Sequence, residues 1–384
     1  MKRTPRKALP FLLFATAVLA CACASVGARG AAGPAGNPEK PIELIFTGDI
    51  MAHEVNYSMR DYARIYESVE PLLRSATLCF GNLEVPVDDA LPLSTYPRFN
   101  VHAPYIRAAI DAGFNVFSLA NNHSNDQGSA GILATRALLD SLAPKIGSSG
   151  LRAKEGEPMR PVILNAGENE VVFLSITEIL NSHDPSANLV YFVPPTKAAR
   201  SAFLADVRRI RGENPNALFV LAIHLDEPEY VRTVRRAKRE WFRELAAAGV
   251  DIVWGSHPHV MQEWEVATVE RGRSRRQVLF MYSMGNFISG QRKEINREDP
   301  GAYREYTGDG IVMRVTVRSG AIAAVPVPVT VYVDPEAGPV LRPFDASFVA
   351  SLAEPLQDYY CARYALMRAY LPLPPMPVRA ILEQ

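Results

Sequence analysis

The sequence predicts an α/β fold in which parallel strands carry polar side chains to the edge of a sheet. Apolar runs alternate with segments of helical spacing along most of the chain, a pattern typical of βαβ units. Several of these runs are followed by short polar strings. In open α/β sheets, residues in this position lie at the carboxyl edge of the sheet, where ligands bind. Consecutive strands follow at 277–282, 310–317 and 321–333, so we expect parallel sheet first and antiparallel sheet after it.

Each element of this prediction depends on a local pattern. The expected strands of the first part are 42–47, 77–81, 116–120, 171–176, 218–223 and 250–254, with a further strand at 260–269. The expected helices are 61–76, 105–112, 129–142, 197–211, 230–248 and 346–370. Pro104 precedes one helix, and Gly113 and Gly249 follow two others as C-terminal caps. Two sheets with helices on their outer faces would accommodate this order.

Composition indicates a soluble globular protein with a sizeable core. Of 384 residues, 48% are hydrophobic and 21% are charged. Lys+Arg and Asp+Glu number 41 each, so no net field favours nucleic acid as a partner. No linker rich in Pro and Gly divides the body, and we therefore predict a single domain over 41–384.

Residues 1–24 are predicted to be an export signal. Four basic residues precede the apolar stretch 11–20, which is too short to span a bilayer. Val18-Leu19-Ala20-Cys21 resembles the lipobox of bacterial lipoproteins, so Cys21 is the expected lipidation site. Simple secretion and an uncleaved anchor are the alternatives. Residues 25–40 would form a flexible tether, and the protein would be held at the periplasmic or extracellular face of a membrane.

The first polar strings supply carboxylates and an amide. Asp49 follows Gly48 at a strand end, where a carboxylate is a natural metal ligand; an Asx turn is the alternative. Asn82 and Glu84 face the same side of an extended chain. Both could address one ion, or Asn82 could bind while Glu84 orients a ligand; a polar turn without a ligand is the third interpretation.

The string Asn121-Asn122-His123 follows another apolar strand and precedes Asp126. A buried cluster of amides and imidazole must find hydrogen bonds, which favours a functional role over a self-satisfied polar loop. We expect Asn122 to bind metal through its carbonyl oxygen and Asn121 to support the site. His123 would be the acid or anion-stabilising group, oriented by Asp126.

Three histidines end two further strands. His224 follows 218–223, and His257 and His259 flank Pro258 after 250–254. On an extended chain both imidazoles of this pair would face one metal, and the proline would stiffen the spacing. Asn286 follows a later strand and is expected to bind substrate or support the site. This mixture of donors suits a divalent cation such as Mn, Zn, Mg or Fe.

In order, these motifs resemble the bacterial capsule synthesis CapA family, associated with the synthesis and export of poly-gamma-glutamate. The resemblance spans about 42–290, and the strings that carry it are Gly48-Asp49-Ile50-Met51, Gly81-Asn82-Leu83-Glu84-Val85-Pro86, Leu119-Ala120-Asn121-Asn122-His123, Gly255-Ser256-His257-Pro258-His259 and Tyr282-Ser283-Met284-Gly285-Asn286-Phe287. That family resembles the calcineurin-like metallophosphoesterases. The resemblance implies a metallophosphatase-like four-layer sandwich of two mixed sheets flanked by helices, with metal ligands at Asp49, Asn122, His224, His257 and His259.

Two departures from the phosphoesterase pattern bear on the number of ions. Met51 stands where a second ligand is expected, and Asn82 or Glu84 replaces the bridging Asp. A bridging carboxylate offsets repulsion between adjacent cations, so we expect one ion, or two that bind loosely. The loop 225–230 also differs from the family pattern and carries extra negative charge.

Two functions of different classes follow. The first is a metal-dependent hydrolase of the cell envelope that cleaves a phosphoester or an envelope polymer during capsule synthesis. The alternative is a non-catalytic surface protein that binds an anionic polymer and works with the machinery that makes or exports it.

Overall fold

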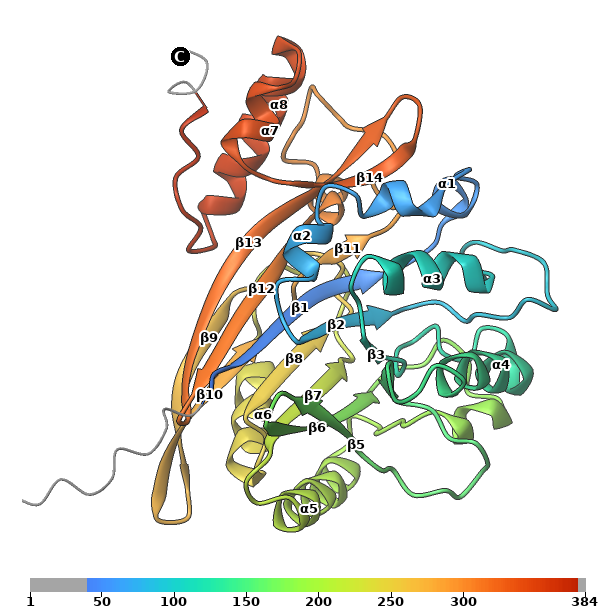
Figure 1. Cartoon of the computed structure of the whole chain (residues 1–384), viewed down its shortest axis with the longest axis vertical. Helices are drawn as coiled ribbons and strands as arrows, with labels where there is room; N and C mark the ends of the chain where they lie inside the picture. The colour runs from blue at the N-terminus through green and yellow to red at the C-terminus, as the bar shows by residue number, and fades with distance from the viewer. Residues whose placement is uncertain (1–39, 379–384) are drawn as a thin grey trace, which may run out of the picture. The chain divides into compact units, whose positions relative to one another are not determined.

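The strands that the sequence predicts are apolar runs, and those at 42–50, 78–83, 218–224 and 252–256 are buried along almost their whole length, so both faces of each sheet are covered. In the computed structural model, which describes residues 40–378, these strands form two mixed sheets (Figure 1). The first has the order β14-β13-β12-β1-β2-β3-β4, with β11 also paired to β1, and the second has the order β5-β6-β7-β8-β10-β9. The predicted α/β fold of two mixed sheets flanked by helices is confirmed.

The strands of the first sheet are β1 (Ile42–Ile50), β2 (Leu78–Leu83), β3 (Val116–Ser118), β4 (Gly147–Ser149), β11 (Asn286–Ile288), β12 (Asp309–Arg318), β13 (Ala321–Asp334) and β14 (Gly338–Pro343). Those of the second sheet are β5 (Val162–Ala166), β6 (Asn169–Thr177), β7 (Leu218–His224), β8 (Ile252–Ser256), β9 (Trp264–Arg271) and β10 (Ser274–Met281). Strands β1 to β4 are parallel to one another, as are β6, β7, β8 and β10. Their carboxyl ends therefore meet at one rim.

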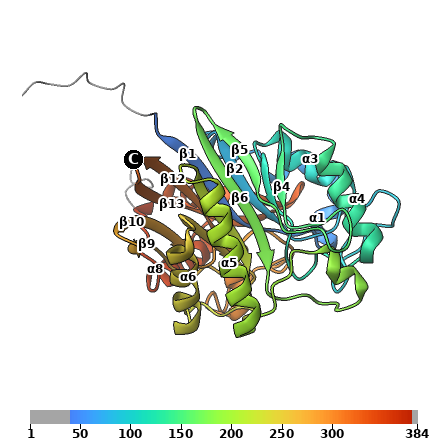
Figure 2. The ribbon, with the colours of Figure 1, turned by 90° about the horizontal axis from the view of Figure 1, so that it is seen from below.

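The helices are α1 (Glu54–Tyr57), α2 (Glu70–Leu73), α3 (Ala103–Asp111), α4 (Gly128–Asp140), α5 (Lys197–Glu213), α6 (Arg236–Ala248), α7 (Ala346–Ala350) and α8 (Glu354–Arg368). Three short 3-10 turns are η1 (Tyr62–Ile65), η2 (Pro185–Leu189) and η3 (Tyr303–Gly308). Helices α5 and α6 lie side by side over the second sheet (Figure 2). Alternate strand residues such as Leu174 face this helical layer, whereas Phe173 faces the other sheet.

Aromatic side chains fill the space between the sheets close to the rim. Phe46 and Phe80 stack with ring centroids 4.6 Å apart, and Trp254 meets Phe46 edge-on at 5.7 Å. The indole Nε1 of Trp254 donates a hydrogen bond of 3.0 Å to the carbonyl oxygen of Thr47. This bond joins β8 of one sheet to β1 of the other, two residues before Asp49, and helps to fix their relative position.

Several predicted element boundaries were wrong. The helix expected at 61–76 is two short pieces, η1 and α2, and the strand expected at 260–269 begins only at Trp264. The helix expected from Tyr230 begins at Arg236, because Tyr230 has φ +65° and its N–H bonds the carbonyl oxygen of Pro258. The closing helix is divided into α7 and α8, with Pro355 in the first turn of α8.

The predicted signal peptide at 1–24, the lipidation site Cys21 and nearly all of the tether at 25–40 lie outside the described residues. Among residues 40–378, no helix combines the length and apolar character needed to cross a bilayer.

A buried charged cluster fastens α8 to the first sheet. The carboxylate of Asp309 accepts hydrogen bonds from Arg292 at 2.9 Å, from Arg363 at 2.6 Å and 3.0 Å, and from Thr330 at 2.8 Å. Burial alone would raise the pKa of Asp309, but the charges of the two arginines outweigh it and hold the pKa below its ordinary value. The carboxylate therefore contributes stability above the unfolded pKa of about 3.9, which is lost as the pH falls through the lower folded pKa.

We expect Asp309→Ala to lower the free energy of unfolding by about 3–5 kcal/mol, because it leaves two buried guanidinium groups without their carboxylate. Chemical denaturation at neutral pH measures this change. The control is Asp140→Ala, which removes an exposed partner of Arg136 and should leave stability nearly unchanged. Equal stability of the two variants would contradict this assignment.

Candidate metal centre

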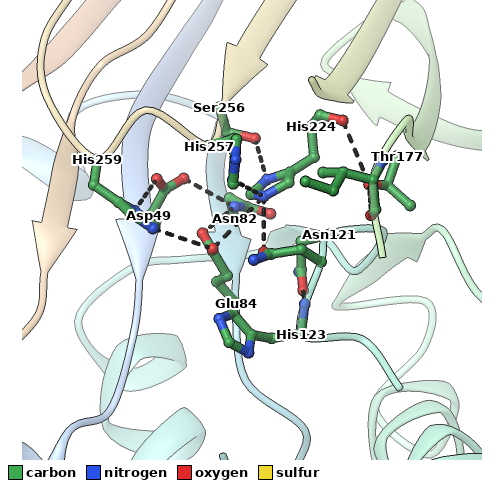
Figure 3. A network of polar contacts seen from close by, with 12 residues as sticks. Asp49, Asn82, Glu84, Asn121, His123, Thr177, His224, Ser256, His257 and His259 are labelled. Atoms are coloured by element: carbon green, nitrogen blue, oxygen red, sulfur yellow. Dashed lines mark hydrogen bonds and ion pairs between the residues drawn. The ribbon is translucent and has the colours of Figure 1, made fainter. Parts of the chain in front are cut away.

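The rim where the parallel strands end carries a cluster of buried polar side chains (Figure 3). In the register of the first sheet, Asp49 on β1 lies beside Asn82 on β2 and Asn286 on β11. In the second sheet, His224 at the end of β7 lies beside Ser256 on β8. The two sheets thus bring side chains that are up to 237 residues apart in the sequence to one place.

Glu84, His224 and His257 form a first ligand group in which each residue offers one donor atom. The Nε2 of His224 lies 3.1 Å from the Nδ1 of His257 and 3.6 Å from the Oε1 of Glu84. It also lies 3.0 Å from the Oδ1 of Asn122. All three side chains of the group are buried.

Asp49, Glu84 and His259 form a second ligand group. The Nδ1 of His259 lies 3.1 Å from the Oδ2 of Asp49, and its Nε2 lies 3.7 Å from the Oε1 of Glu84. Glu84 therefore belongs to both groups. It occupies the position between them that a bridging carboxylate would take.

The environment of Glu84 fits a bound cation. Its Oε1 is buried and meets no hydrogen-bond donor among the described residues, although it lies between the imidazoles of His224 and His259. Burial, followed by the charge of Asp49, raises the pKa of Glu84 well above its usual range. Burying a carboxylate oxygen without a hydrogen-bond partner costs free energy, and a bound divalent cation would offset that cost. Donors that share an ion at about 2.0–2.2 Å lie about 3–4.5 Å apart, close to the separations here.

The histidines are held in the form that binds metals. Burial, and after it the neighbouring His257, lowers the pKa of His224 well below its ordinary value. Burial, followed by the neighbouring His259, lowers the pKa of His257 to about 3. Both imidazoles are therefore neutral near pH 7 and keep a lone pair for a ligand bond. For the same reason, the contact of His224 with Glu84 is not an ion pair.

The backbone around Pro258 differs from the sequence expectation. His257 has φ +101° and His259 has φ +57°, so the segment is not an extended chain with both imidazoles on one face. Instead, the two rings belong to different ligand groups, with centroids 5.9 Å apart. Positive φ values in residues other than glycine are uncommon and cluster at functional sites, where the surrounding structure holds them.

Gly48 permits the close approach on the other side of the site. A Cβ atom at this position would lie 1.9 Å from the carbonyl oxygen of Gly285, so any side chain would push β11 away. The N–H of Asp49 donates to that same oxygen at 3.0 Å. The glycine thus allows β1 and β11 to place Asp49 and Asn286 next to His259.

The predicted acid group lies beside the two ligand groups. The Nδ1 of His123 lies 2.7 Å from the Oδ2 of Asp126, which also accepts the N–H of Phe99 at 2.8 Å. The ring of Phe99 stands edge-on to that of His123 at 4.7 Å. The carboxylate of Asp126 therefore restrains the direction of the His123 ring.

The remaining amides position the ligands. Asn82 donates from Nδ2 to Asp49 at 2.9 Å and to Glu84 at 3.2 Å, which keeps the two carboxylates in place. Asn121 donates to the carbonyl oxygen of Leu83 at 2.8 Å and thereby holds the loop that follows β3. Asn286 meets the Nδ1 of His259 at 3.0 Å through its Oδ1.

The sequence left open which of Asn82 and Glu84 would contact a metal ion. The geometry favours Glu84, which belongs to both ligand groups.

Sequence reasoning missed two residues that contact the site. Ser256 meets the Nδ1 of His224 at 2.8 Å and so directs Nε2 toward the ligand group. Asn181 lies 3.2 Å from the Nδ1 of His123 and bonds Asn122 through both side chain and backbone. Ser256 stands in the string that contains His257 and His259, whereas Asn181 follows β6 in a loop without any distinctive pattern.

A pocket of about 670 Å³, which we call the entry pocket, opens beside the centre. His123 and His259 line it, together with Met51, His53 and Tyr230. His53 accepts the N–H of Gly290 at 3.1 Å and belongs to neither ligand group. Burial, and then the charges of His259 and His123, lowers its pKa to about 4.

Comparison with known proteins identifies the family. Residues 43–291, well over half of the chain, match the family described as "Bacterial capsule synthesis protein PGA_cap". The chain therefore belongs to this family. The resemblance to the CapA family predicted from the motifs is confirmed.

Two relatives carry capsule names. The "Capsule biosynthesis protein CapA" of Bacillus anthracis is 26% identical over 309 residues, which cover 76% of this chain and 70% of the relative. The "PGA biosynthesis protein CapA" of Bacillus subtilis (strain 168) is 24% identical over 267 residues, which cover 64% of this chain and 63% of that protein, less than two thirds of its length. A solved structure of a hypothetical protein from Thermus thermophilus has a TM-score of 0.43, with 16% identity over 75% of this chain and 99% of that one.

We predict that Glu84→Gln reduces bound Mn²⁺ or Zn²⁺ in untagged protein more than His257→Ala does, because Glu84 serves both ligand groups and His257 only the first. Elemental analysis after dialysis against the metal measures the content. His183→Ala, which removes an exposed histidine in neither group, is the control and should keep the wild-type content. Wild-type metal content in the Glu84→Gln variant would contradict the assignment.

Proposed function

We propose that this PGA_cap family member is a metal-dependent hydrolase of the cell envelope, which cleaves a phosphoester or an envelope polymer during capsule synthesis. The observation that carries the proposal is the convergence of two ligand groups on the buried oxygen of Glu84, which meets no donor in the described part of the chain. A site built only to bind an anionic polymer would present cationic groups, and here the innermost side chains include the carboxylates of Asp49 and Glu84 and the neutral imidazoles of His224 and His257.

The two ligand groups support a centre of two ions with Glu84 shared between them. His224 and His257 would hold one ion with Glu84, and Asp49 and His259 would hold the other. Bound divalent cations supply Lewis-acid chemistry, polarising a phosphoryl or carbonyl oxygen of the substrate. Asn122, whose Oδ1 lies 3.0 Å from the Nε2 of His224, would join the first of these groups.

His123 is the proposed proton donor. Its Nδ1 is engaged by Asp126, which leaves Nε2 to carry a proton to the leaving group. His123 lines the entry pocket together with His259, a member of the second ligand group, so a substrate held there can contact both. Asp126 acts by fixing the tautomer and direction of the imidazole.

The envelope location and partners are also part of the proposal. The capsule names of the two relatives favour a polymer of the cell surface, or its synthesis and export machinery, as the partner. Lipidation at Cys21 would hold the domain at the membrane on the side where such a polymer emerges.

We expect His123→Ala to lower kcat about 10²- to 10⁴-fold and to leave the bound metal unchanged, because His123 lies outside both ligand groups. Turnover of p-nitrophenyl phosphate and of γ-linked polyglutamate by the Mn-loaded protein measures the effect. His183→Ala is again the control.

Unchanged turnover in the His123→Ala variant would contradict the assigned role. If the Mn-, Zn- or Mg-loaded protein cleaves neither substrate, the hydrolase proposal fails. Polymer binding that needs no metal and survives the loss of His257 and His259 would then support the accessory protein.

A further inference from the structure

Four exposed arginines lie at the end of the two sheets opposite the candidate metal centre. Arg273, Arg275 and Arg276 belong to the tip of the β9–β10 hairpin, and Arg318 is the last residue of β12. Figure 1 shows this hairpin at the end of the molecule where β1 begins, whereas the arrowhead of β1 points to the rim. We call the surface formed by these four residues the basic pole.

Contacts between the two sheets bring the arginines of the basic pole together. The N–H of Ile322 donates to the Oε1 of Gln277 at 2.8 Å, which joins β13 to β10 next to Arg276. A Cβ atom on Gly320, in the turn after Arg318, would lie 4.0 Å from the Nη1 of Arg276. Two turns that belong to different sheets therefore form one continuous surface.

The acidic groups at this end leave the basic pole with a positive charge. None of its four arginines forms an ion pair within residues 40–378. Glu270 lies opposite Arg275 in the register of the hairpin. Of the other carboxylates here, Glu168 is paired with Lys40 at 3.6 Å, and Glu43 accepts a hydrogen bond from a threonine of β12. The exposed arginines therefore present an excess of positive charge to the surroundings.

A second basic layer lies beneath the basic pole. Arg211 and Arg271 both pair with the carboxylate of Asp251, at 2.5 Å and 2.6 Å. Burial lowers the pKa of Arg211, and the charges of Arg271 and Arg276 lower it further against the attraction of Asp251. Because two guanidinium groups share one carboxylate, this layer adds to the positive charge of the exposed arginines.

The described chain begins at the same end of the molecule. Ile42, the first residue of β1, is paired with Val317, next to Arg318. The predicted lipidation site Cys21 precedes Lys40 by about 19 residues, which reach about 65 Å when fully extended and about 25 Å as a flexible chain. An anchor in that segment would therefore hold the basic pole, rather than the rim, close to the bilayer.

We propose that the basic pole docks on a membrane surface that carries anionic phospholipid headgroups. Guanidinium groups bind phosphate through paired hydrogen bonds, and each basic side chain near an anionic bilayer adds to the attraction. A tether that enters the domain at the basic pole would keep the pole at a high effective concentration near the lipids, so that several weak contacts suffice. The inference rests on the proposed envelope location, but it needs neither bound metal nor turnover.

Docking at the basic pole would turn the candidate metal centre away from the bilayer. Strand β12 runs from the rim, where Gly310 bridges Gly285 beside Asp49, to Arg318 at the basic pole. At about 3.4 Å for each residue, this distance is about 25–30 Å. The entry pocket would therefore open toward the space outside the membrane, where a polymer of the cell surface can reach it.

Co-sedimentation of the full chain with lipid vesicles tests this inference. The wild-type protein should bind vesicles of phosphatidylglycerol and phosphatidylcholine more tightly than vesicles of phosphatidylcholine alone. We expect the triple variant Arg273→Gln, Arg275→Gln, Arg276→Gln to bind the anionic vesicles more weakly, by about fivefold for each arginine and about 100-fold in all. Added salt should weaken binding of the wild-type protein more than binding of this variant.

Two further triple variants serve as controls. Arg60→Gln, Arg107→Gln, Arg297→Gln removes the same charge from exposed arginines outside the basic pole, and it should bind like the wild-type protein. Arg273→Lys, Arg275→Lys, Arg276→Lys keeps the charge of the hairpin and should keep most of the binding. All variants share residues 1–39, so any contribution of that segment to vesicle binding is the same in each.

Equal binding of the wild-type protein and the hairpin glutamine variant would overturn the inference, as would an equal loss in the control that lacks Arg60, Arg107 and Arg297. Loss of binding in the lysine variant, or equal affinity of the wild-type protein for the two kinds of vesicle, would also contradict it. If the hairpin arginines bind soluble polyglutamate but not vesicles, the basic pole is a polymer site instead.

The proposed function is tested separately, because metal content and turnover are measured without vesicles. A protein that docks through its hairpin arginines but hydrolyses nothing contradicts only the hydrolase. A protein that cleaves p-nitrophenyl phosphate but ignores anionic vesicles contradicts only the docking surface.

Discussion

The burial of the Glu84 carboxylate between two histidines is the interaction on which the rest of the site depends. Its Oε1 lies 3.6 Å from the Nε2 of His224 and 3.7 Å from that of His259, and no described residue donates a hydrogen bond to it. An uncompensated carboxylate in such a place costs several kcal/mol. The imidazole of His224 is neutral and cannot offset it, and a divalent cation is the compensation that the donor set fits.

The fold holds this arrangement in place from both sheets. The first sheet supplies Asp49 and Glu84, the second supplies His224 and His257, and the hydrogen bond from Trp254 to Thr47 joins the two just below the rim. Gly48 and the positive φ values of His257 and His259 allow approaches that ordinary strand geometry forbids. The aromatic rings of Phe46 and Trp254, which precede Gly48 and His257 along the chain, pack against each other between the sheets.

The site residues that can be predicted from the sequence are those at the ends of strands. Asp49, His224 and His257 follow apolar runs, and parallel strands necessarily bring such positions to one rim. Glu84 could not be separated from Asn82, because both face the same side of the chain and only the packing decides which side chain reaches the histidines. The left-handed conformations beside Pro258 have only a weak signal in residue type, since histidine is enriched at positive φ but still adopts negative φ in most positions.

The most direct test is anomalous diffraction from crystals of the protein soaked in Mn²⁺ or Zn²⁺. The geometry predicts an anomalous peak within about 2.0–2.2 Å of a Glu84 carboxylate oxygen, with His224 and His257 or Asp49 and His259 completing the coordination. A metal bound elsewhere with Glu84 uninvolved, or a fully soaked crystal without a peak at this rim, would contradict the assignment of the metal centre.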